Sequence, residues 1–390
     1  MDQIINSILD NDLYKFSMQM AVVNKFPYAK VRSGFINRGG TKFPDGFAEE
    51  LRRQIKFMED LELTNWEKKG LQQKCSFFSP TYIDFLAGYR YDSSEVGIIQ
   101  NGGDLEISID GYWYRQILWE VPLMAIISEL YFKMTEQDAW GKHERDKNNA
   151  EKQKTFRLNS LHYADFGTRR RYSYDIQQEF ISSQVGIGSN TFVGTSNVAL
   201  ALEYDIKPIG THAHEWFMFH AAKYGYKMAN YLAMENWSDV FRGDLDIALS
   251  DTFTTNSFLK SFDKKFAKLY DGVRHDSGEP LEFADKIIEH YKKLGIDPNS
   301  KTVVFSDSLN PKMAVKIADY CKGKIKCSFG IGTNFTNDVG VKPLNMVIKM
   351  IEAKPEGESW HKCVKLSDSE GKHTGDADEI KLSKQVLNLC

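Results

Sequence analysis

The sequence predicts an α/β fold in which a barrel of parallel strands follows a smaller α/β domain. The chain has 390 residues, more than one ordinary domain, so two domains or one enlarged barrel are expected. Between about residues 160 and 335, short apolar runs end in small or polar residues, and a helical pattern follows each run. This alternation predicts parallel strands joined by crossover helices. Because no dinucleotide-type glycine turn interrupts it, a closed barrel is favoured over an open sheet.

The predicted strands end in polar segments that would meet on one face of the barrel. In a parallel barrel the loops after the strands form the active face, so these segments are more informative together than singly. The seven runs end at residues 165–167, 194–196, 210–212, 250–251, 275–277, 306–308 and 330–332.

Helices are predicted between these runs from apolar spacing and from start signals. A proline in the first turn precedes the helices expected over residues 281–294 and 313–320. Another helix is indicated by four apolar residues at helical spacing on one face: Phe258, Phe262, Phe266 and Leu269.

The two ends of the chain differ from this barrel pattern. The first 130 residues predict strands over 26–37 and 105–120 and helices over 47–58 and 65–72. After Gly340, a strand over 344–351 and a polar tail lead to a short helix over 376–389. We therefore expect an N-terminal domain at 1–130, a barrel with the active site at 131–340, and a C-terminal segment at 341–390 that packs back on the N-terminal domain.

Composition narrows the class of protein. Hydrophobic residues make up 42% and charged residues 26%, which is ordinary globular composition. The net charge of −3 argues against a generally basic nucleic-acid surface, so local arginines must attract any anionic ligand. Five cysteines without a CxxC pair favour a reducing compartment over a disulfide framework or structural zinc. With no signal peptide and no apolar run that could span a bilayer, we expect a cytoplasmic protein without a membrane partner.

Arg169, Arg170 and Arg171 follow one predicted strand end, at an expected helix start. Arginine forks suit phosphate and carboxylate oxygens, whereas cations oppose the dipole of a helix N-terminus. Three together therefore indicate an anion, although a solvated basic turn is the alternative. Phe166, just before them, suits either the core or a platform on which a flat ring stacks.

His212, His214 and Glu215 follow another predicted strand. Metal ligation is the weaker interpretation, because no further histidines lie nearby in the sequence. A nucleophilic or proton-carrying histidine is the second, and a purely structural histidine is the third.

Three carboxylates and a glycine-bearing loop complete the predicted set. Asp251, Asp276 and Asp307 each end an apolar run, and carboxylates that converge there suit Mg²⁺ or sugar hydroxyls, although each could instead cap a helix. The loop with Gly330, Gly332 and Thr333 lets backbone amides approach a phosphate, and its late position in the barrel strengthens a weak motif.

Taken together, these motifs resemble the nicotinate phosphoribosyltransferase family over nearly the whole chain. The matching segments lie at residues 12–15, 166–170, 194–197, 210–216, 250–252, 274–278, 305–307, 329–333 and 342–345. The resemblance implies a TIM-like but irregular α/β barrel fused to an α/β sandwich domain. It also implies the joining of nicotinate to phosphoribosyl pyrophosphate, giving nicotinate mononucleotide and pyrophosphate in the Preiss–Handler salvage route to NAD. Mg²⁺, ATP as a co-substrate and a homodimer are implied as well.

The resemblance also assigns roles to residues. Tyr14, expected from the partner subunit, and Phe166 beside Gly167 would sandwich the pyridine ring, and Arg169 and Arg274 would neutralise negative charge. His214 would be the phosphorylated histidine, with Glu215 as its orienting partner, and Glu215, Arg274 and Asp276 would also be catalytic. The ribose hydroxyls and magnesium would fall to Asp251, Asp276 and Asp307, of which the last two are the metal ligands. Ser277, Gly278, Gly330, Gly332 and Thr333 would also bind substrate.

Alternatives differ in substrate or in class. Relatives that use nicotinamide carry an aspartate at the position of Ser196, which would repel a carboxylate, so Ser196 favours the acid. A quinolinate-using relative would need a larger basic set. A sugar-phosphate aldolase or isomerase would need a buried lysine or glutamate at a strand end. A nucleotide-binding sensor would share the pocket without releasing pyrophosphate.

Overall fold

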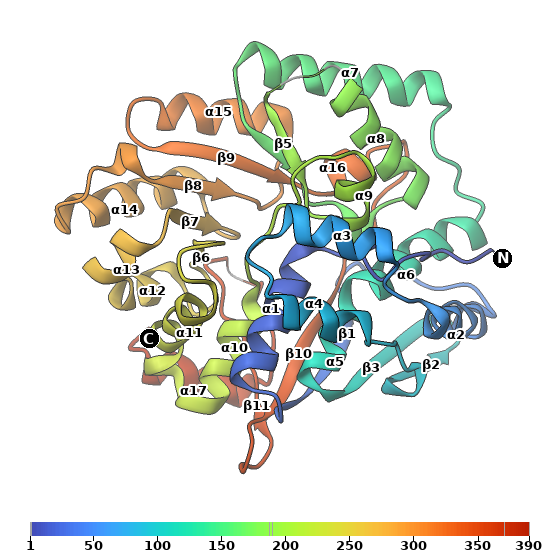
Figure 1. Cartoon of the computed structure of the whole chain (residues 1–390), viewed down its shortest axis with the longest axis horizontal. Coiled ribbons are helices and arrows are strands. Elements are labelled where there is room, and N and C mark those ends of the chain that lie inside the picture. The colour runs from blue at the N-terminus through green and yellow to red at the C-terminus, as the bar shows by residue number, and fades with distance from the viewer. Residues whose placement is uncertain (1, 187, 189, 370, 390) are drawn as a thin grey trace.

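The computed structural model describes every residue of the chain except 1, 187, 189, 370 and 390, and contains two sheets (Figure 1). One sheet is antiparallel, in the order β11-β10-β1-β3-β2, and the other is parallel, in the order β5-β4-β9-β8-β7-β6. The predicted fold class, α/β with a smaller domain beside a parallel strand-helix domain, is confirmed.

The antiparallel sheet gathers strands from both ends of the chain. Its central strand β1 pairs with β3 on one side and with β10 on the other. Alternate residues of β3 are buried, as expected of a sheet with one solvated face. The strands are β1 (Lys30–Asn37), β2 (Val96–Asn101), β3 (Asp104–Tyr112), β10 (Met346–Lys354) and β11 (His361–Lys362). The main helices of this part are α1 (Leu13–Lys25), α2 (Phe47–Phe57), α3 (Asn65–Lys74), α4 (Pro80–Ala87), α5 (Trp113–Gln116) and α6 (Glu120–Met134).

Two predicted strands of this domain were too long. The strand expected over residues 105–120 ends at Tyr112, where the chain turns into α5 and then α6. Trp113 and Gln116 to Val121 are buried without alternation, which fits helical turns in a core rather than a half-exposed strand. The strand expected from residue 26 starts at Lys30, because α1 occupies the chain up to Lys25. Every residue from Leu13 to Val22 of α1 is buried, so this helix has no amphipathic signature.

The parallel sheet has the strand order of a barrel that is open between β5 and β6. Its first strand, β4, pairs in parallel with its last strand, β9, which is the pairing that a closed barrel requires. The strands are β4 (Tyr163–Asp165), β5 (Phe192–Thr195), β6 (Ile247–Leu249), β7 (Gly272–His275), β8 (Thr302–Phe305) and β9 (Lys326–Ile331). The helices are α7 (Lys142–Leu158), α8 (Tyr174–Gly186), α9 (Val198–Glu203), α10 (His214–Tyr224), α11 (Tyr226–Phe241), α12 (Thr255–Ser261), α13 (Lys264–Leu269), α14 (Pro280–Lys293), α15 (Pro311–Cys321) and α16 (Thr333–Thr336).

The third of the seven predicted strands, which ends at residues 210–212, is irregular. Pro208 forms one parallel bridge to Thr195 of β5, and the ladder goes no further. Helix α1 packs here instead: the Ser17 hydroxyl donates to the carbonyl of Thr211 at 2.6 Å, so that carbonyl is satisfied by a side chain. This segment lies between β5 and β6 in the chain, and closure of the barrel across it stays a prediction.

The aromatic helix predicted around residues 258–269 is two helices, α12 and α13. The Asp263 side chain accepts from the N–H groups of Lys265 and Phe266 and so starts α13 as its N-cap. Phe262 and Phe266 are buried as expected, whereas Leu269 is 39% exposed.

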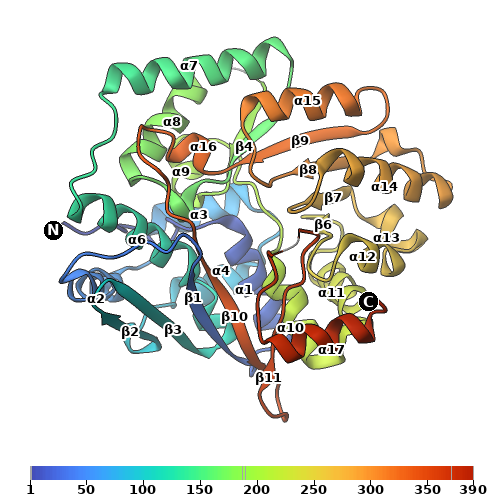
Figure 2. The ribbon, with the colours of Figure 1, turned by 180° about the vertical axis from the view of Figure 1, so that it is seen from behind.

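The C-terminal segment serves both parts of the molecule. Strand β10 pairs with β1, whereas the last helix, α17 (Ala377–Val386), packs against α11, where the Tyr226 hydroxyl donates to Glu379 Oε1 at 2.6 Å. Figure 2 shows the stretch between β11 and α17, in dark red, rising to the level of β6 before it turns back. The domain limits at 130 and 340 stay predictions. None of the described helices is long and apolar enough to cross a membrane.

Asp246, just before β6, generates a stability prediction. Its two carboxylate oxygens are buried without a hydrogen-bond partner among the described residues, and burial, with Asp271 and Asp244 nearby, raises its pKa from 3.8 to about 7. A raised pKa means that the folded state holds the proton more tightly. The stability from this group is therefore complete below about pH 4 and is lost as the pH rises to about 7.

We expect Asp246→Asn to be more stable than the unmodified protein at pH 8, by about 1–2 kcal/mol, with a smaller difference at pH 5. Urea unfolding at the two pH values measures this, with Asp244→Asn at the exposed neighbour as the control. A variant that is less stable at pH 8 than at pH 5, relative to the unmodified protein, would contradict the assignment.

Candidate active site

The imidazole of His214 is buried at the carboxyl ends of the parallel strands. It is the first residue of α10 and is 6% exposed. Nδ1 lies 3.0 Å from Thr252 Oγ1, and Nε2 lies 3.0 Å from Asp276 Oδ2 and 2.8 Å from Lys365 Nζ. Burial and the Lys365 charge lower the pKa of His214 to about 4, so the ring is neutral at pH 7.

Two carboxylates converge on this ring with their own partners. Asp276 Oδ1 accepts from the Arg274 guanidinium at 2.9 Å and from the Ser306 hydroxyl at 2.8 Å. Asp251 Oδ2 accepts from the Ser277 hydroxyl at 2.5 Å and lies 3.6 Å from Lys365 Nζ. Although burial opposes it, Arg274 holds the pKa of Asp276 well below its usual value, and Lys365 lowers that of Asp251. Both acids are ionised.

His214, Asp251 and Asp276 form the one group of described residues with suitable metal-ligand geometry. One ligand atom from each lies within 4.8 Å of the others. Asp251 Oδ1 is buried and has no hydrogen-bond partner among the described residues, so an oxygen is free for a cation or a sugar hydroxyl. Asp307, predicted as the second metal ligand, is not in this group: its Oδ2 pairs with Lys372 at 2.8 Å.

Phe166 forms an aromatic platform next to this cluster. Its ring lies over Gly330: a Cβ on that residue would come within 2.4 Å of the ring carbons, so only glycine admits the ring. The Arg274 guanidinium lies 5.8 Å from the ring centroid. Phe166 is only half-buried, which leaves room for a further ring to stack.

Tyr14 and Arg169 lie beside one another in the same chain. The Tyr14 hydroxyl is close enough to raise the pKa of Arg169, and burial raises the pKa of Tyr14 itself. The expectation that a partner subunit supplies the tyrosine of the site stays a prediction, because a single chain does not test it.

Glu215 belongs to a buried ion network and does not orient His214. Its carboxylate binds Lys15 and accepts from the Trp113 indole at 2.9 Å. Lys15 Nζ also lies 2.5 Å from Glu120, whose other oxygen is 3.5 Å from Arg169. Since Thr252, Asp276 and Lys365 contact the ring of His214, the predicted orienting role passes to them.

His212 packs its ring against Trp237 and Phe217, at 4.7 and 5.2 Å between centroids, and lies in the core.

Ser196 contacts the carboxylate of Asp12, two residues before Tyr14. Its hydroxyl donates to Asp12 Oδ1 at 2.7 Å, and burial raises the pKa of Asp12, although Arg169 and Ser196 oppose that shift. The side chain of Ser196 thus points toward the segment that carries Tyr14.

The three consecutive arginines have different surroundings. Arg169 and Arg170 lie in a single 3-10 turn over residues 168–170, and Arg171 follows this turn. Helix α8 begins only at Tyr174. Arg171 is fully buried in a bidentate pair with Asp10, with both contacts at 2.7 Å. The anion that this arginine binds is therefore a side chain of the protein and not a ligand. Burial, Arg169 and Arg38 lower the pKa of Arg170 to about 10, which is the signature of clustered cations.

The remaining predicted residues frame this region. A Cβ on Gly167 would lie 2.3 Å from the Thr336 side chain, so this glycine is required for packing. Gly332 and Thr333 begin α16 directly after β9. The N–H of Gly278, a residue with φ of +87°, donates to Ser369 Oγ at 3.0 Å.

Sequence reasoning missed four cations of this site. Lys365 and Lys372 come from the tail, Lys349 from β10 and Arg38 from the end of β1. Burial lowers the pKa of Lys349 to about 8 despite Glu120 nearby. These residues have no motif of their own, and only the pairing of β10 with β1 brings them to the barrel.

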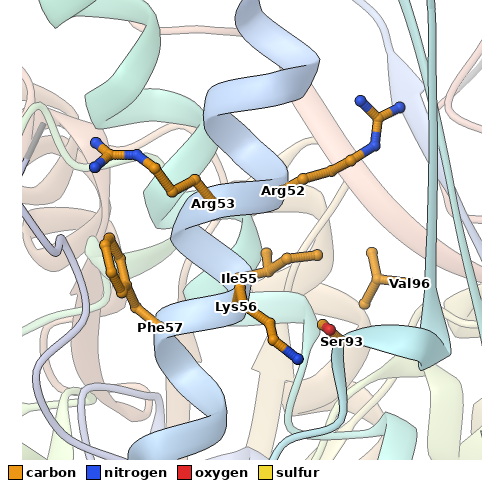
Figure 3. Close-up of a pocket in the computed structure, with 7 residues that line it drawn as sticks. All are labelled: Arg52, Arg53, Ile55, Lys56, Phe57, Ser93 and Val96. Atoms are coloured by element: carbon orange, nitrogen blue, oxygen red, sulfur yellow. The ribbon is translucent and has the colours of Figure 1, made fainter.

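The hollows of the surface differ in what they touch. One of about 460 Å³ lies along α2 between residues such as Arg52, Lys56 and Val96 (Figure 3), but Arg52 donates to the Ile98 carbonyl and Lys56 pairs with Glu59. Another, of about 360 Å³, is lined by Ser277, Gly278 and the tail residues 367–369 and borders the His214 cluster.

Comparison with known proteins gives one family throughout. The model of the nicotinate phosphoribosyltransferase family matches residues 161–390, and that of its N-terminal domain matches residues 9–128. A nicotinate phosphoribosyltransferase of Chromohalobacter salexigens is 56% identical over 386 residues, with 99% of each chain covered. The crystal structure of the nicotinate phosphoribosyltransferase of Porphyromonas gingivalis is 44% identical with a TM-score of 0.96, covering 99% of this chain and 100% of that one. A putative nicotinate phosphoribosyltransferase of Saccharomyces cerevisiae is 33% identical with a TM-score of 0.94, covering 100% of both.

The buried pair of Arg171 and Asp10 yields a prediction that separates a structural arginine from ligand-binding ones. Arg171→Met leaves the Asp10 carboxylate buried without its cation and should lower the free energy of unfolding by about 3–5 kcal/mol. Adding Asp10→Asn should restore part of that loss. Arg170→Met, which removes one of several clustered cations, should cost little. Chemical denaturation of the four proteins measures these differences, and equal losses for Arg171→Met and Arg170→Met would refute the distinction.

Proposed function

The chain belongs to the nicotinate phosphoribosyltransferase family, and from that premise we propose that it joins nicotinate to phosphoribosyl pyrophosphate, forming nicotinate mononucleotide and pyrophosphate. The observation that carries the proposal is the cluster of Asp251, Asp276 and Arg274 beside the open face of Phe166. It combines the anions, the cation and the aromatic surface that this reaction needs.

The chemistry follows from the charges that develop. As pyrophosphate leaves the ribose carbon, positive charge grows on the sugar and negative charge on the leaving oxygens. Ionised Asp251 and Asp276 stabilise the first, and Arg274 stabilises the second. The pyridine nitrogen attacks the carbon, so no protein nucleophile is needed at the sugar.

The ring site favours an acid over an amide. Phe166 and Tyr14 would hold the two faces of the pyridine, and Arg169 would pair with its carboxylate. An aspartate at position 196 would stand beside Asp12 and repel that carboxylate, whereas Ser196 donates to Asp12.

Mg²⁺ suits the donors of the site. When bound, it would offset the charge of the pyrophosphate group. Asp276 would hold it, and the free oxygen of Asp251 is a further donor. Asp307 could take part only by releasing Lys372.

ATP would act through His214. The ring is neutral and enclosed, and it faces a cluster in which Lys365 and Arg274 can meet phosphate oxygens. Transfer of the γ-phosphoryl group to this histidine would couple hydrolysis to substrate binding. Its product, nicotinate mononucleotide, would enter the Preiss–Handler route to NAD in the cytoplasm. We propose a homodimer on the family resemblance.

Substrate choice provides a direct test of the proposed reaction. We expect pyrophosphate release with nicotinate and phosphoribosyl pyrophosphate, at a kcat/KM at least about 100-fold above that with nicotinamide. Ser196→Asp should lower kcat/KM for nicotinate by about 10–100-fold and raise the relative use of nicotinamide, because it adds a second buried carboxylate. Ser196→Ala is the matched control, with a smaller loss. Comparable turnover of the two substrates by the unmodified enzyme would overturn the choice of acid.

Phosphorylation has its own test. Incubation with ATP labelled in the γ-phosphate should give an acid-labile phosphate on the unmodified protein and on His212→Asn, but not on His214→Asn. The His212 ring lies in the aromatic core, so it is the natural control. Label that survives loss of His214 but not loss of His212 would reverse the assignment.

A further inference from the structure

The tail of the chain brings a lysine to the ring of His214. Lys365 Nζ lies 2.8 Å from His214 Nε2 and 3.6 Å from Asp251 Oδ2, and its side chain is 9% exposed. A lysine ammonium has three donors and no acceptor. When the ammonium donates across this contact, Nε2 accepts with its lone pair and the ring proton lies on Nδ1.

Thr252 completes this arrangement on the other side of the ring. Its hydroxyl oxygen lies 3.0 Å from Nδ1 and can accept that proton. Its backbone carbonyl accepts the N–H of Leu366 at 2.8 Å, one residue after Lys365. One residue thus fixes both the ring and the segment that carries the lysine. Two backbone hydrogen bonds of 2.9 Å between Lys365 and Thr374 hold this segment further.

The neighbouring carboxylates favour the opposite tautomer. Asp276 Oδ2 lies 3.0 Å from the same Nε2, and Asp251 Oδ1 lies 3.8 Å from it. An ionised carboxylate only accepts hydrogen bonds. Without the ammonium, Nε2 would carry a proton directed at Asp276, and its lone pair would not be available for attack.

We propose that Lys365 is a positioning residue that keeps Nε2 of His214 unprotonated and so makes Nε2 the atom that accepts a phosphoryl group. This inference rests on the proposed phosphorylation of His214. The lone pair forms the bond to the γ-phosphorus of ATP, the bond from that phosphorus to the bridging oxygen breaks, and ADP leaves with its electron pair. The Nδ1 proton stays on the ring, held by Thr252, and Lys365 then donates to the new phosphoryl oxygens.

The tautomer can be measured without ATP, by nitrogen NMR of protein labelled with ¹⁵N-histidine and assigned with His214→Asn. We expect the signals of a neutral ring with its proton on Nδ1 in the unmodified protein and in Lys365→Arg. Lys365→Met, which keeps the length of the side chain but not the donor, should lose that pattern. Lys362→Met is the matched control, because Lys362 is an exposed lysine of the same segment that pairs with Asp376.

The rate of labelling by ATP is the second readout. Lys365→Met should be phosphorylated at least about 100-fold more slowly, Lys365→Arg within about 10-fold of the unmodified rate, and Lys362→Met at that rate. Recovery by arginine separates a donor to Nε2 from a residue needed only for packing.

Two results would overturn the proposal. One is a proton on Nε2 of His214 in the unmodified protein, a result that needs no folded Lys365 variant. The other is a Lys365→Met protein that keeps both the Nδ1–H pattern and the normal labelling rate. Absence of label on the unmodified protein would instead overturn the phosphorylation itself, and it is recognisable because the tautomer is measured without ATP.

Discussion

The pairing of β10 with β1 is the constraint on which the site depends. After β9 the chain leaves the parallel sheet, adds a strand to the antiparallel one and then returns to the barrel. The return is fixed by Leu366, whose N–H bonds to Thr252, and by Ser369, which accepts from Gly278. Without that excursion, Lys349 and Lys365 would have no reason to lie beside Arg169 and His214. The second sheet therefore builds part of the site as well as a domain.

Charge pairing explains how so many ionised groups are tolerated together. A buried charge is costly unless a partner of opposite sign and hydrogen bonds compensate it. Lys15 lies between Glu120 and Glu215, Arg274 meets Asp276, and Lys365 lies between Asp251 and His214. Lys15 and Lys365 each come from a different element from their partners, so these ion pairs form only when distant parts of the chain are folded together. Stabilisation of a charged transition state requires charges that are held in place in this way.

Sequence patterns predicted the parts whose signals are local. Strand ends with Asp251 and Asp276 and the helix over residues 281–294 follow from short motifs or periodicity. Helix α1 was not predicted, because residues 13–22 are all buried and show no periodicity. The strand expected to end at residues 210–212 is irregular, because Ser17 of α1 bonds to the Thr211 carbonyl. The pairing of Arg171 with Asp10 and the approach of Lys365 to His214 join residues about 150 or more positions apart, and a single sequence carries no signal of such contacts.

The most direct measurement is a crystal structure of the protein with nicotinate and a non-reactive analogue of phosphoribosyl pyrophosphate. The account predicts the pyridine ring between Phe166 and Tyr14, its carboxylate on Arg169, and the ribose hydroxyls within hydrogen-bond distance of Asp251 or Asp276. A ring bound away from Phe166, or ribose hydroxyls far from both carboxylates, would contradict it.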